Sequence, residues 1–269
     1  MAVLFSIATI ILGLLVGFMI NVVSTRLSAN RPILGPFRCT RSPHGLAWWQ
    51  MLPLVGYVVQ GGRCRTCGKS ISAAYPLAEL LVSGLYITLL ALNGWSWTLP
   101  FLLQSVYVAF LVIVLVIDWK HRDIYLSIIG LGSLVALVGS MLLPGVGIVS
   151  ALIGAAVAGG FFALAFGMAR LIFPHIEEPL GQGDVFLALM MGLMLGFPNI
   201  VGALLIGPLL AGAAALLMLV SRRSKLGDFM PYGVALCAAT MLFLIYPAPF
   251  AEALRLPALM TVLAGLFQA

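Results

Sequence analysis

The sequence predicts an all-α polytopic integral membrane protein of about eight transmembrane helices, with a small cytoplasmic insertion domain. Of its 269 residues, 62% are hydrophobic and only 8% are charged, whereas about a quarter of the residues in a soluble domain are charged. A soluble fold of this length could not enclose so much apolar surface in one core. The apolar residues also form runs of membrane-spanning length, so we expect lipid to surround most of the chain.

These apolar runs give the order of the expected helices. A span needs about 20 apolar residues to cross about 30 Å of hydrocarbon, and short breaks containing Pro, Gly or Asn separate the runs as turns. We expect the first run to be a retained helix, because it lacks the basic start and the small-residue cleavage site of a signal peptide. The expected helices cover residues 3–23, 77–93, 100–117, 124–143, 146–172, 185–197, 200–220 and 231–248.

The basic residues test this arrangement and set its orientation. When the spans alternate, 13 of the 14 Lys and Arg residues fall on one side of the membrane and only Arg255 falls on the other. The positive-inside rule makes the basic side cytoplasmic and the N-terminus external. The net charge of +6 therefore reflects topology at a lipid bilayer, and we expect no nucleic-acid partner. The predicted parts are a first transmembrane helix at 1–23, a cytoplasmic cysteine-containing domain at 24–76 and a helical bundle at 77–269.

Asp118 lies in an unusual place for an acidic residue. It follows the apolar run 110–117 at the C-terminus of an expected helix, where the helix dipole disfavours an anion. An acidic residue at membrane depth is a candidate functional group. The alternative is an interfacial Asp that pairs with Lys120 or Arg122.

Asp184 is the second unusual acidic residue, because it closes the glycine-rich segment Gly181-Gln-Gly183-Asp. The alternative is a helix N-cap, which is a common role for Asp. The helix that follows, from Val185 to Phe197, would be about 20 Å long at 1.5 Å per residue and is therefore shorter than a full bilayer. The loop would then lie below the membrane surface, and its glycines would let another backbone approach closely.

Asp118 and Asp184 are predicted to lie on the same side of the membrane, near the edge of the hydrocarbon. Two carboxyl groups at close range tend to share one proton. The ionised member can then draw a proton from water while the protonated member donates to a peptide carbonyl. This is the chemistry of an aspartyl protease, although sequence spacing alone leaves open whether the two groups meet.

Three cysteines fall within the cytoplasmic segment. Cys64 and Cys67 have the spacing of half a zinc site, and Cys39 lies upstream. A reducing compartment favours a metal over a disulfide. A structural zinc ion needs four ligands, and His44 is the candidate for the fourth. The alternative is a metal-free loop with three free thiols.

An ordered series of motifs resembles the type IV prepilin peptidases, which are GxGD intramembrane aspartyl proteases. The resemblance covers roughly residues 10 to 240, and the series as a whole is far more specific than an isolated GxGD segment. The motifs are Gly17–Arg26, Pro53–Tyr57, Gly62–Cys67, Ile71–Leu80, Asp118, Gly181–Asp184 and Pro231–Gly233.

The resemblance implies a function for the whole chain. Asp118 and Asp184 would be the catalytic pair of a protease bundle at 77–269, with Gly181 and Gly183 in the active-site loop. The enzyme would cleave the leader from prepilins or pseudopilins, the precursors of type IV pili and type II secretion systems, at the cytoplasmic face of the bacterial inner membrane. Many members also methylate the new N-terminus with S-adenosylmethionine, and this second activity rests on resemblance alone.

The sequence departs from the family pattern at three positions. The second CxxC of the family is Cys39-Thr-Arg-Ser42 here, which is why His44 is considered as the fourth zinc ligand. The usual Pro after the first catalytic Asp is Tyr125, and the Lys that commonly follows the second is Phe186. Because both carboxylates remain, we expect peptidase activity to survive.

The alternatives to a protease are a proton-coupled transporter and an inactive scaffold. A proton-coupled transporter would place its acidic residues near the bilayer midplane and would often show internal repeats, whereas these acids lie near one face and no clear repeat is evident. An inactive scaffold of the pilus or secretion machinery would keep the fold without needing both aspartates. The retained pair therefore favours the protease.

Overall fold

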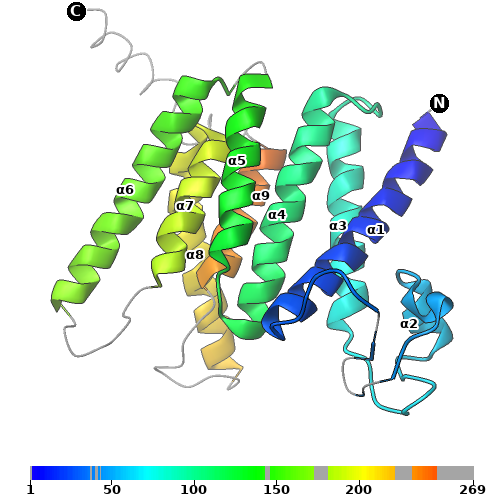
Figure 1. Cartoon of the computed structure of the whole chain (residues 1–269). Helices are drawn as coiled ribbons and strands as arrows, with labels where there is room; N and C mark the ends of the chain where they lie inside the picture. Colours follow the sequence, from blue (N-terminus) through cyan, green and yellow to red (C-terminus); the bar gives the residue numbers. More distant parts are fainter. Residues whose placement is uncertain are drawn as a thin grey trace, which may run out of the picture. The chain divides into compact units, whose positions relative to one another are not determined.

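The computed structural model describes residues 2–36, 38, 39, 42, 44–142, 146–172, 181–221 and 232–246 (Figure 1). The chain divides into two compact units, Met1–Ile117 and Asp118–Ala269. The described residues contain only helices and two isolated β-bridges, with no strand. The helices are α1 (Ala2–Ser28), the 3-10 helix η1 (Trp48–Met51), α2 (Val55–Val59), α3 (Ala74–Leu92), α4 (Leu99–His121), α5 (Leu126–Leu142), α6 (Ile148–Ile172), α7 (Gln182–Leu195), α8 (Asn199–Val220) and α9 (Tyr232–Ile245).

Each of the eight apolar helices expected from the sequence is present. Five of them, α1, α3, α4, α6 and α8, are long and apolar enough to cross a membrane. The other three, α5, α7 and α9, are apolar but have only 14 to 17 residues. The all-α, polytopic membrane class is therefore confirmed. The turn expected between the helices at 124–143 and 146–172 lies outside the described part of the chain. The same is true of the basic residues Arg222, Arg223 and Lys225.

In the first unit, α1 packs closely along α3 (Figure 1). Two glycines one helical turn apart make this approach possible. A Cβ atom at Gly13 would lie 2.5 Å from the Cα of Ser83, and one at Gly17 would lie 2.6 Å from the Cα of Glu79. Small residues at such crossings let helix backbones approach each other in a membrane, where dispersion contacts drive association. The motif that begins at Gly17 therefore brings α1 against Glu79.

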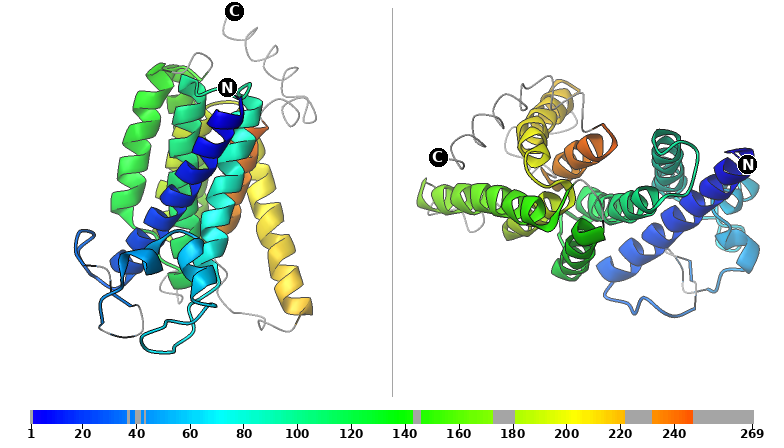
Figure 2. Two further views of the ribbon diagram at one scale, coloured as in Figure 1. Left: turned by 90° about the vertical axis from the view of Figure 1, so that its right-hand side faces the viewer. Right: turned by 90° about the horizontal axis from the view of Figure 1, so that it is seen from above.

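In the second unit, α7 is the central helix. It contacts α5, α6, α8 and α9, and Figure 2 shows these helices around it. Nine of its 14 residues are buried, including Asp184 in its first turn. A short helix that packs against four other helices can carry a polar group inside the protein, because those neighbours shield the group from lipid.

The contact between α6 and α7 depends on small residues. A Cβ atom at Gly154 would lie 2.6 Å from the carbonyl oxygen of Gly192, and one at Gly192 would overlap the Gly154 carbonyl. Neither backbone can move without separating the two helices. The glycine pair therefore fixes the position of α7, which carries Asp184.

We expect Gly192→Ala to destabilise the protein, because the added methyl group meets backbone atoms that cannot rotate away. Overpacking of this kind typically costs about 1–3 kcal/mol. Thermal unfolding in detergent should show a lower midpoint than for the wild type. Gly160→Ala on α6 is the matched control, because a Cβ atom there meets nothing within 4 Å. Equal midpoints for the two variants would contradict the close-contact role of Gly192.

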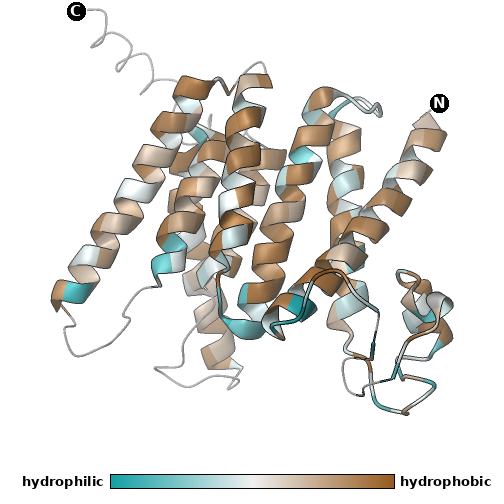
Figure 3. Cartoon of the chain, viewed as in Figure 1, coloured by the Kyte–Doolittle hydropathy of each residue, from teal (hydrophilic) through white to brown (hydrophobic). Residues whose placement is uncertain are grey.

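The start of α7 differs from the sequence expectation. The helix was expected to begin at Val185 with Asp184 as its N-cap alternative, but it begins at Gln182 with Gly181 in the cap position. The amide of Asp184 donates to the carbonyl oxygen of Gly181 at 3.2 Å. The carboxyl group therefore belongs to the first helical turn and is not an N-cap. Figure 3 shows hydrophilic residues at this end of α7 and an apolar surface along the rest of the helix.

Candidate functional site

Asp118 and Asp184 line the same cavity in the second unit, although 66 positions separate them in the sequence. Asp118 comes from the last turn of α4 and Asp184 from the first turn of α7, and their exposed fractions are 4% and 6%. The cavity has a volume of about 270 Å³. Its other lining residues are Arg122, Asp123, Ile124, Leu126, Gly181, Gln182, Gly183, Phe186 and Tyr232.

The carboxyl group of Asp118 is held by the beginning of α9. The backbone N–H of Val234 donates to its Oδ2 at 2.9 Å. Val234 lies in the first turn of α9, where amide groups have no partner within the helix. At Gly233, a Cβ atom would lie 2.8 Å from the same oxygen. The glycine thus leaves the space that allows α9 to contact Asp118.

The two glycines around Asp184 have different neighbours. A Cβ atom at Gly181 would lie 3.3 Å from Oδ2 of Asp184, so this position leaves room for the carboxyl group itself. A Cβ atom at Gly183 would lie 2.7 Å from the Cβ of Ile124 in the α4–α5 connection. From the sequence, both glycines were expected to let another backbone approach closely. At Gly183 the structure differs, because Ile124 of the same chain occupies that space.

If the chain cleaves leader peptides as its family resemblance implies, Gly183→Ala should lower the cleavage rate by about 10- to 100-fold, since displacement of a catalytic group by about 1 Å can cost two orders of magnitude. The new Cβ atom would meet the Cβ of Ile124, which no rotamer change can move. Cleavage rates at equal protein levels in membranes provide the measurement. Gly130→Ala is the control, because its Cβ atom would meet nothing within 4 Å. If Gly183→Ala cleaves at a rate within twofold of the wild-type rate, the close contact between Gly183 and Ile124 is not required for activity.

Tyr232 is a cavity residue to which the sequence analysis assigned no role. It is the first residue of α9 and lies two positions before Val234, the donor to Asp118. The motif Pro231–Gly233 carries part of the family resemblance. It lies far from Asp118 and Asp184 in the sequence, so the sequence gave no indication that Tyr232 would line a cavity with them. Pro231 itself lies outside the described residues. Phe186 lies on the same cavity wall and is partly exposed.

The first unit contains a second cluster, in which the four predicted metal ligands come together. One ligand atom from each of Cys39, His44, Cys64 and Cys67 lies within 4.8 Å of all the others. The Sγ atoms of Cys39 and Cys67 are 3.9 Å apart, and Nε2 of His44 is 3.3 Å from Sγ of Cys64. Tetrahedral zinc with Zn–S bonds of about 2.3 Å would place two sulfur ligands about 3.8 Å apart. The donor set and its spacing therefore fit a structural zinc ion.

Two tight turns present these ligands. The amide of Cys39 donates to the carbonyl oxygen of His44 at 3.0 Å, and the amide of Cys64 donates to that of Lys69 at 2.9 Å. The second turn requires a residue in the left-handed region, which Gly68 supplies with a φ of +68°. A backbone hydrogen bond from Lys69 is the main reason that the pKa of the Cys67 thiol is lowered. A lowered pKa favours the thiolate, the form that binds metals.

Two family models together match most of the chain. The model described as "Bacterial Peptidase A24 N-terminal domain" matches residues 11–93, and that described as "Type IV leader peptidase family" matches residues 105–220. The first match contains the cysteine–histidine cluster and the second contains both cavity aspartates. No solved structure matches the chain.

Curated relatives agree with these matches. A protein of Myxococcus xanthus named "Prepilin leader peptidase/N-methyltransferase" is 36% identical over 221 residues, which cover 81% of this chain and 64% of that protein. Proteins with the same name in Pseudomonas aeruginosa and Bacillus subtilis are 26% and 27% identical. The match to the Pseudomonas protein covers 90% of this chain and 90% of that protein. The match to the Bacillus protein covers 88% of this chain and 92% of that protein. Motifs, fold and relatives together show that the chain belongs to the type IV leader peptidase family.

Proposed function

We propose that the chain is an aspartyl endopeptidase that removes the leader of type IV prepilins or pseudopilins at the cytoplasmic face of the bacterial inner membrane. The observation that carries this proposal is the single cavity lined by the buried carboxyl groups of Asp118 and Asp184. The relatives' name supplies the substrate class. The basic segments next to the expected spans supply the side of the membrane.

The surroundings of the two aspartates favour different roles. Asp118 accepts a hydrogen bond from the Val234 N–H and shares its cavity with the cation of Arg122. Both a donor and a nearby cation favour the charged form of a carboxyl group. We therefore assign Asp118 as the base that takes a proton from the attacking water. Asp184 would be the acid that donates a proton to the scissile carbonyl.

Infrared spectroscopy can test this assignment. The band of a protonated carboxyl group should be lost from the spectrum of Asp184→Asn and kept in that of Asp118→Asn. The reverse pattern would exchange the two roles without affecting the pair as a whole.

The experiment that tests the overall function uses purified protein in proteoliposomes with a prepilin as substrate. We expect one cut that releases the basic leader just before the hydrophobic segment, and no cut by the double variant Asp118→Asn/Asp184→Asn. A wild-type protein that inserts but cleaves neither prepilins nor pseudopilins would overturn the proposal. The scaffold and transporter alternatives would then remain.

We also propose that the chain methylates the amine exposed by cleavage, since the name of the relatives includes N-methyltransferase. The methyl donor would be S-adenosylmethionine. Mass spectrometry of the released mature pilin tests this second activity. An unmodified N-terminus after complete cleavage in the presence of the donor would contradict it.

We further propose that Cys39, His44, Cys64 and Cys67 hold a structural zinc ion. A donor set of three sulfurs and one imidazole is typical of closed, four-coordinate zinc sites. The ion would join the turn that carries Cys39 to the turn that carries Cys67, which lies 28 residues later in the sequence. Ser42 replaces the fourth cysteine of the family pattern, and its side chain is one of the causes that lower the pKa of the Cys67 thiol.

A further inference from the structure

The segment between α1 and α3 carries an apolar face that points outward. Val55, Val58 and Val59 of α2 have exposed fractions of 52%, 66% and 49%. Residues at these spacings lie on one side of a helix, and we call the three together the valine face. A short helix in water normally turns its apolar side to the core. An outward apolar face is instead typical of a surface that contacts a membrane or another protein.

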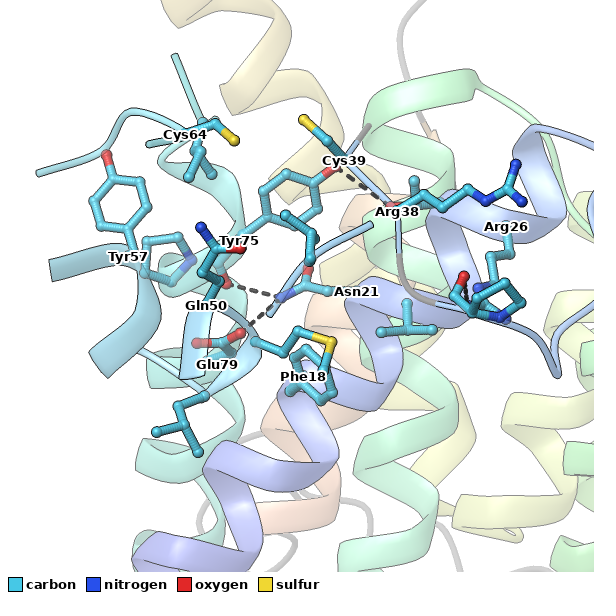
Figure 4. Close-up of a pocket in the computed structure, with 18 of the residues that line it drawn as sticks. Phe18, Asn21, Arg26, Arg38, Cys39, Gln50, Tyr57, Cys64, Tyr75 and Glu79 are labelled. Carbon is cyan, nitrogen blue, oxygen red and sulfur yellow. Dashed lines mark hydrogen bonds between the residues drawn. The ribbon is translucent and has the colours of Figure 1, made fainter. Parts of the chain in front are cut away.

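The opposite side of α2 is already packed. A Cβ atom at Gly56 would lie 2.5 Å from the carbonyl oxygen of Gln50, and Nε2 of Gln60 donates to the carbonyl oxygen of Gly56 at 2.7 Å. Gln50 and Tyr57 line a cavity of about 590 Å³ in the first unit, as Figure 4 shows. α2 therefore cannot rotate to bury its valines without losing these contacts, and the valine face stays outward.

A hydrogen bond sets the height of α2 along α3. The backbone N–H of Leu54, the residue before α2, donates to Oε2 of Glu79 at 2.7 Å. Side chains of a helix lean toward its N-terminus, and Nδ2 of Asn21 donates to both Oε1 of Glu79 and the carbonyl oxygen of Tyr75 (Figure 4). The carboxyl group of Glu79 therefore lies level with the first turn of α3. Leu77 belongs to the same turn and is 63% exposed.

Lipid reaches this height. α3 is long and apolar enough to cross a membrane, and its 19 residues extend about 28 Å at 1.5 Å per residue, which nearly equals the ~30 Å thickness of the hydrocarbon core. Its first turn, with the exposed Leu77, therefore lies at the boundary of the hydrocarbon. Figure 1 shows α2 at the height of the ends of α1 and α3 that this segment joins, and not beyond them. Two membrane-spanning helices thus hold the valine face at the membrane boundary.

The charge of this segment matches an anionic lipid surface. Residues 24–76 contain no Asp or Glu, and their basic residues are Arg26, Arg31, Arg38, Arg41, Arg63, Arg65 and Lys69. Arg63 and Arg65 follow α2 closely and are exposed. The guanidinium group of Arg65 lies 5.5 Å from the centre of the Trp49 ring. Trp is enriched at the headgroup level of membranes, and basic segments next to spans attract anionic lipids. Lipid is therefore the partner that these observations favour.

We propose that the valine face inserts into the leaflet on its own side of the bilayer, with Arg63 and Arg65 among anionic lipid headgroups. The basic residues make this the cytoplasmic leaflet. The segment around α2 is then an interfacial element that lies in the membrane surface without crossing it. It would hold the turns that carry the cysteine–histidine cluster next to the membrane. This inference does not depend on the proposed protease or methylation activity.

Quenching by lipid tests the proposal in the purified full-length protein. A fluorescent amino acid replaces Val58, Leu15 or Ser70 in separate samples, each in vesicles of phosphatidylethanolamine and phosphatidylglycerol with or without bromine on the acyl chains. Leu15 is the membrane control, because it is exposed near the middle of α1. Ser70 is the water control, because it is exposed in the same segment but outside the valine face. We expect bromine to lower the fluorescence about twofold at positions 58 and 15 and to have little effect at position 70.

A charge on the valine face provides a second test. Val58→Asp should reduce quenching of a probe at position 55 to the level of the Ser70 probe, because hydrocarbon excludes a carboxylate. Val58 is exposed, so the substitution leaves the packing of the first unit intact. Ser70→Asp is the matched control, since it adds the same charge outside the valine face and should leave the quenching at position 55 unchanged.

The outcomes distinguish lipid from water and from a protein partner. Quenching at position 58 that matches position 15, together with its loss at position 55 in Val58→Asp, supports insertion. Quenching at position 58 no stronger than at position 70 overturns it. If the probe at position 58 is unquenched by lipid but becomes shielded from aqueous iodide when a prepilin is added, the valine face binds a peptide and the lipid proposal is wrong. Equal quenching at position 55 in Val58→Asp and the unsubstituted protein also overturns it.

Discussion

Asp118→Asn and Asp184→Asn should each lower the rate of leader cleavage about 1,000-fold or more, because each removes one half of the proposed general acid–base pair. Asn has nearly the same shape as Asp, but it can neither take a proton from water nor donate one as an acid. The two aspartates line one cavity and are both buried, whereas Asp123, the third described carboxylate at this cavity, is exposed. Rates should be measured with a prepilin in membranes that contain equal amounts of each variant.

Asp123→Asn is the informative comparison for these variants. Asp123 borders the same cavity, but it lies exposed in the connection after α4. Its loss should reduce the rate by less than about tenfold, because it has no assigned role in proton transfer. If Asp118→Asn or Asp184→Asn cleaves as fast as Asp123→Asn, the assignment of the catalytic pair is wrong.

Loss of the proposed zinc ion is expected to have the second large effect, on the structure of the segment between Cys39 and Cys67. The purified protein should contain about one zinc ion per chain, and Cys64→Ser and His44→Ala should each lose most of it, because closed zinc sites need four ligands. Structural zinc binding contributes about 10–16 kcal/mol of apparent folding free energy in small domains at neutral pH. We therefore expect the residues between Cys39 and Cys67 to become sensitive to proteases.

Cys237→Ser controls for the loss of any cysteine. Cys237 is buried in α9 and does not belong to the metal cluster. Its replacement should leave the zinc content unchanged, as measured by elemental analysis of the purified protein. A full zinc content in Cys64→Ser, or none in the wild type, would contradict the proposed site.

The sequence predicted the helices well because their signal is local. A long apolar run needs lipid, and a helix satisfies its own backbone hydrogen bonds there whatever its neighbours are. The eight expected helices are therefore found close to their predicted positions. The sequence predicted the ends of the helices less precisely than their positions, because each end depends on individual capping interactions. The start of α7 at Gln182, three residues before the predicted Val185, is an example.

The candidate metal ligands could also be recognised from residue type and spacing. Cys64 and Cys67 have a spacing that predicts half a site, and chemistry suggested Cys39 and His44 as partners. Sequence could not show that their ligand atoms lie within 4.8 Å of one another, because two separate turns bring them together.

By itself, the sequence determined the membrane class, the order of the helices and the residues with suitable chemistry. Only the tertiary structure placed Asp118 and Asp184 at one cavity, brought the Val234 amide to Asp118 and packed Ile124 against Gly183. It also left two buried acceptors, Oδ1 of Asn21 and Oε1 of Gln60, without a hydrogen-bond partner among the described residues. Hydrophobicity and helix formation act between residues near each other in the chain, whereas these contacts join residues that only helix packing brings together.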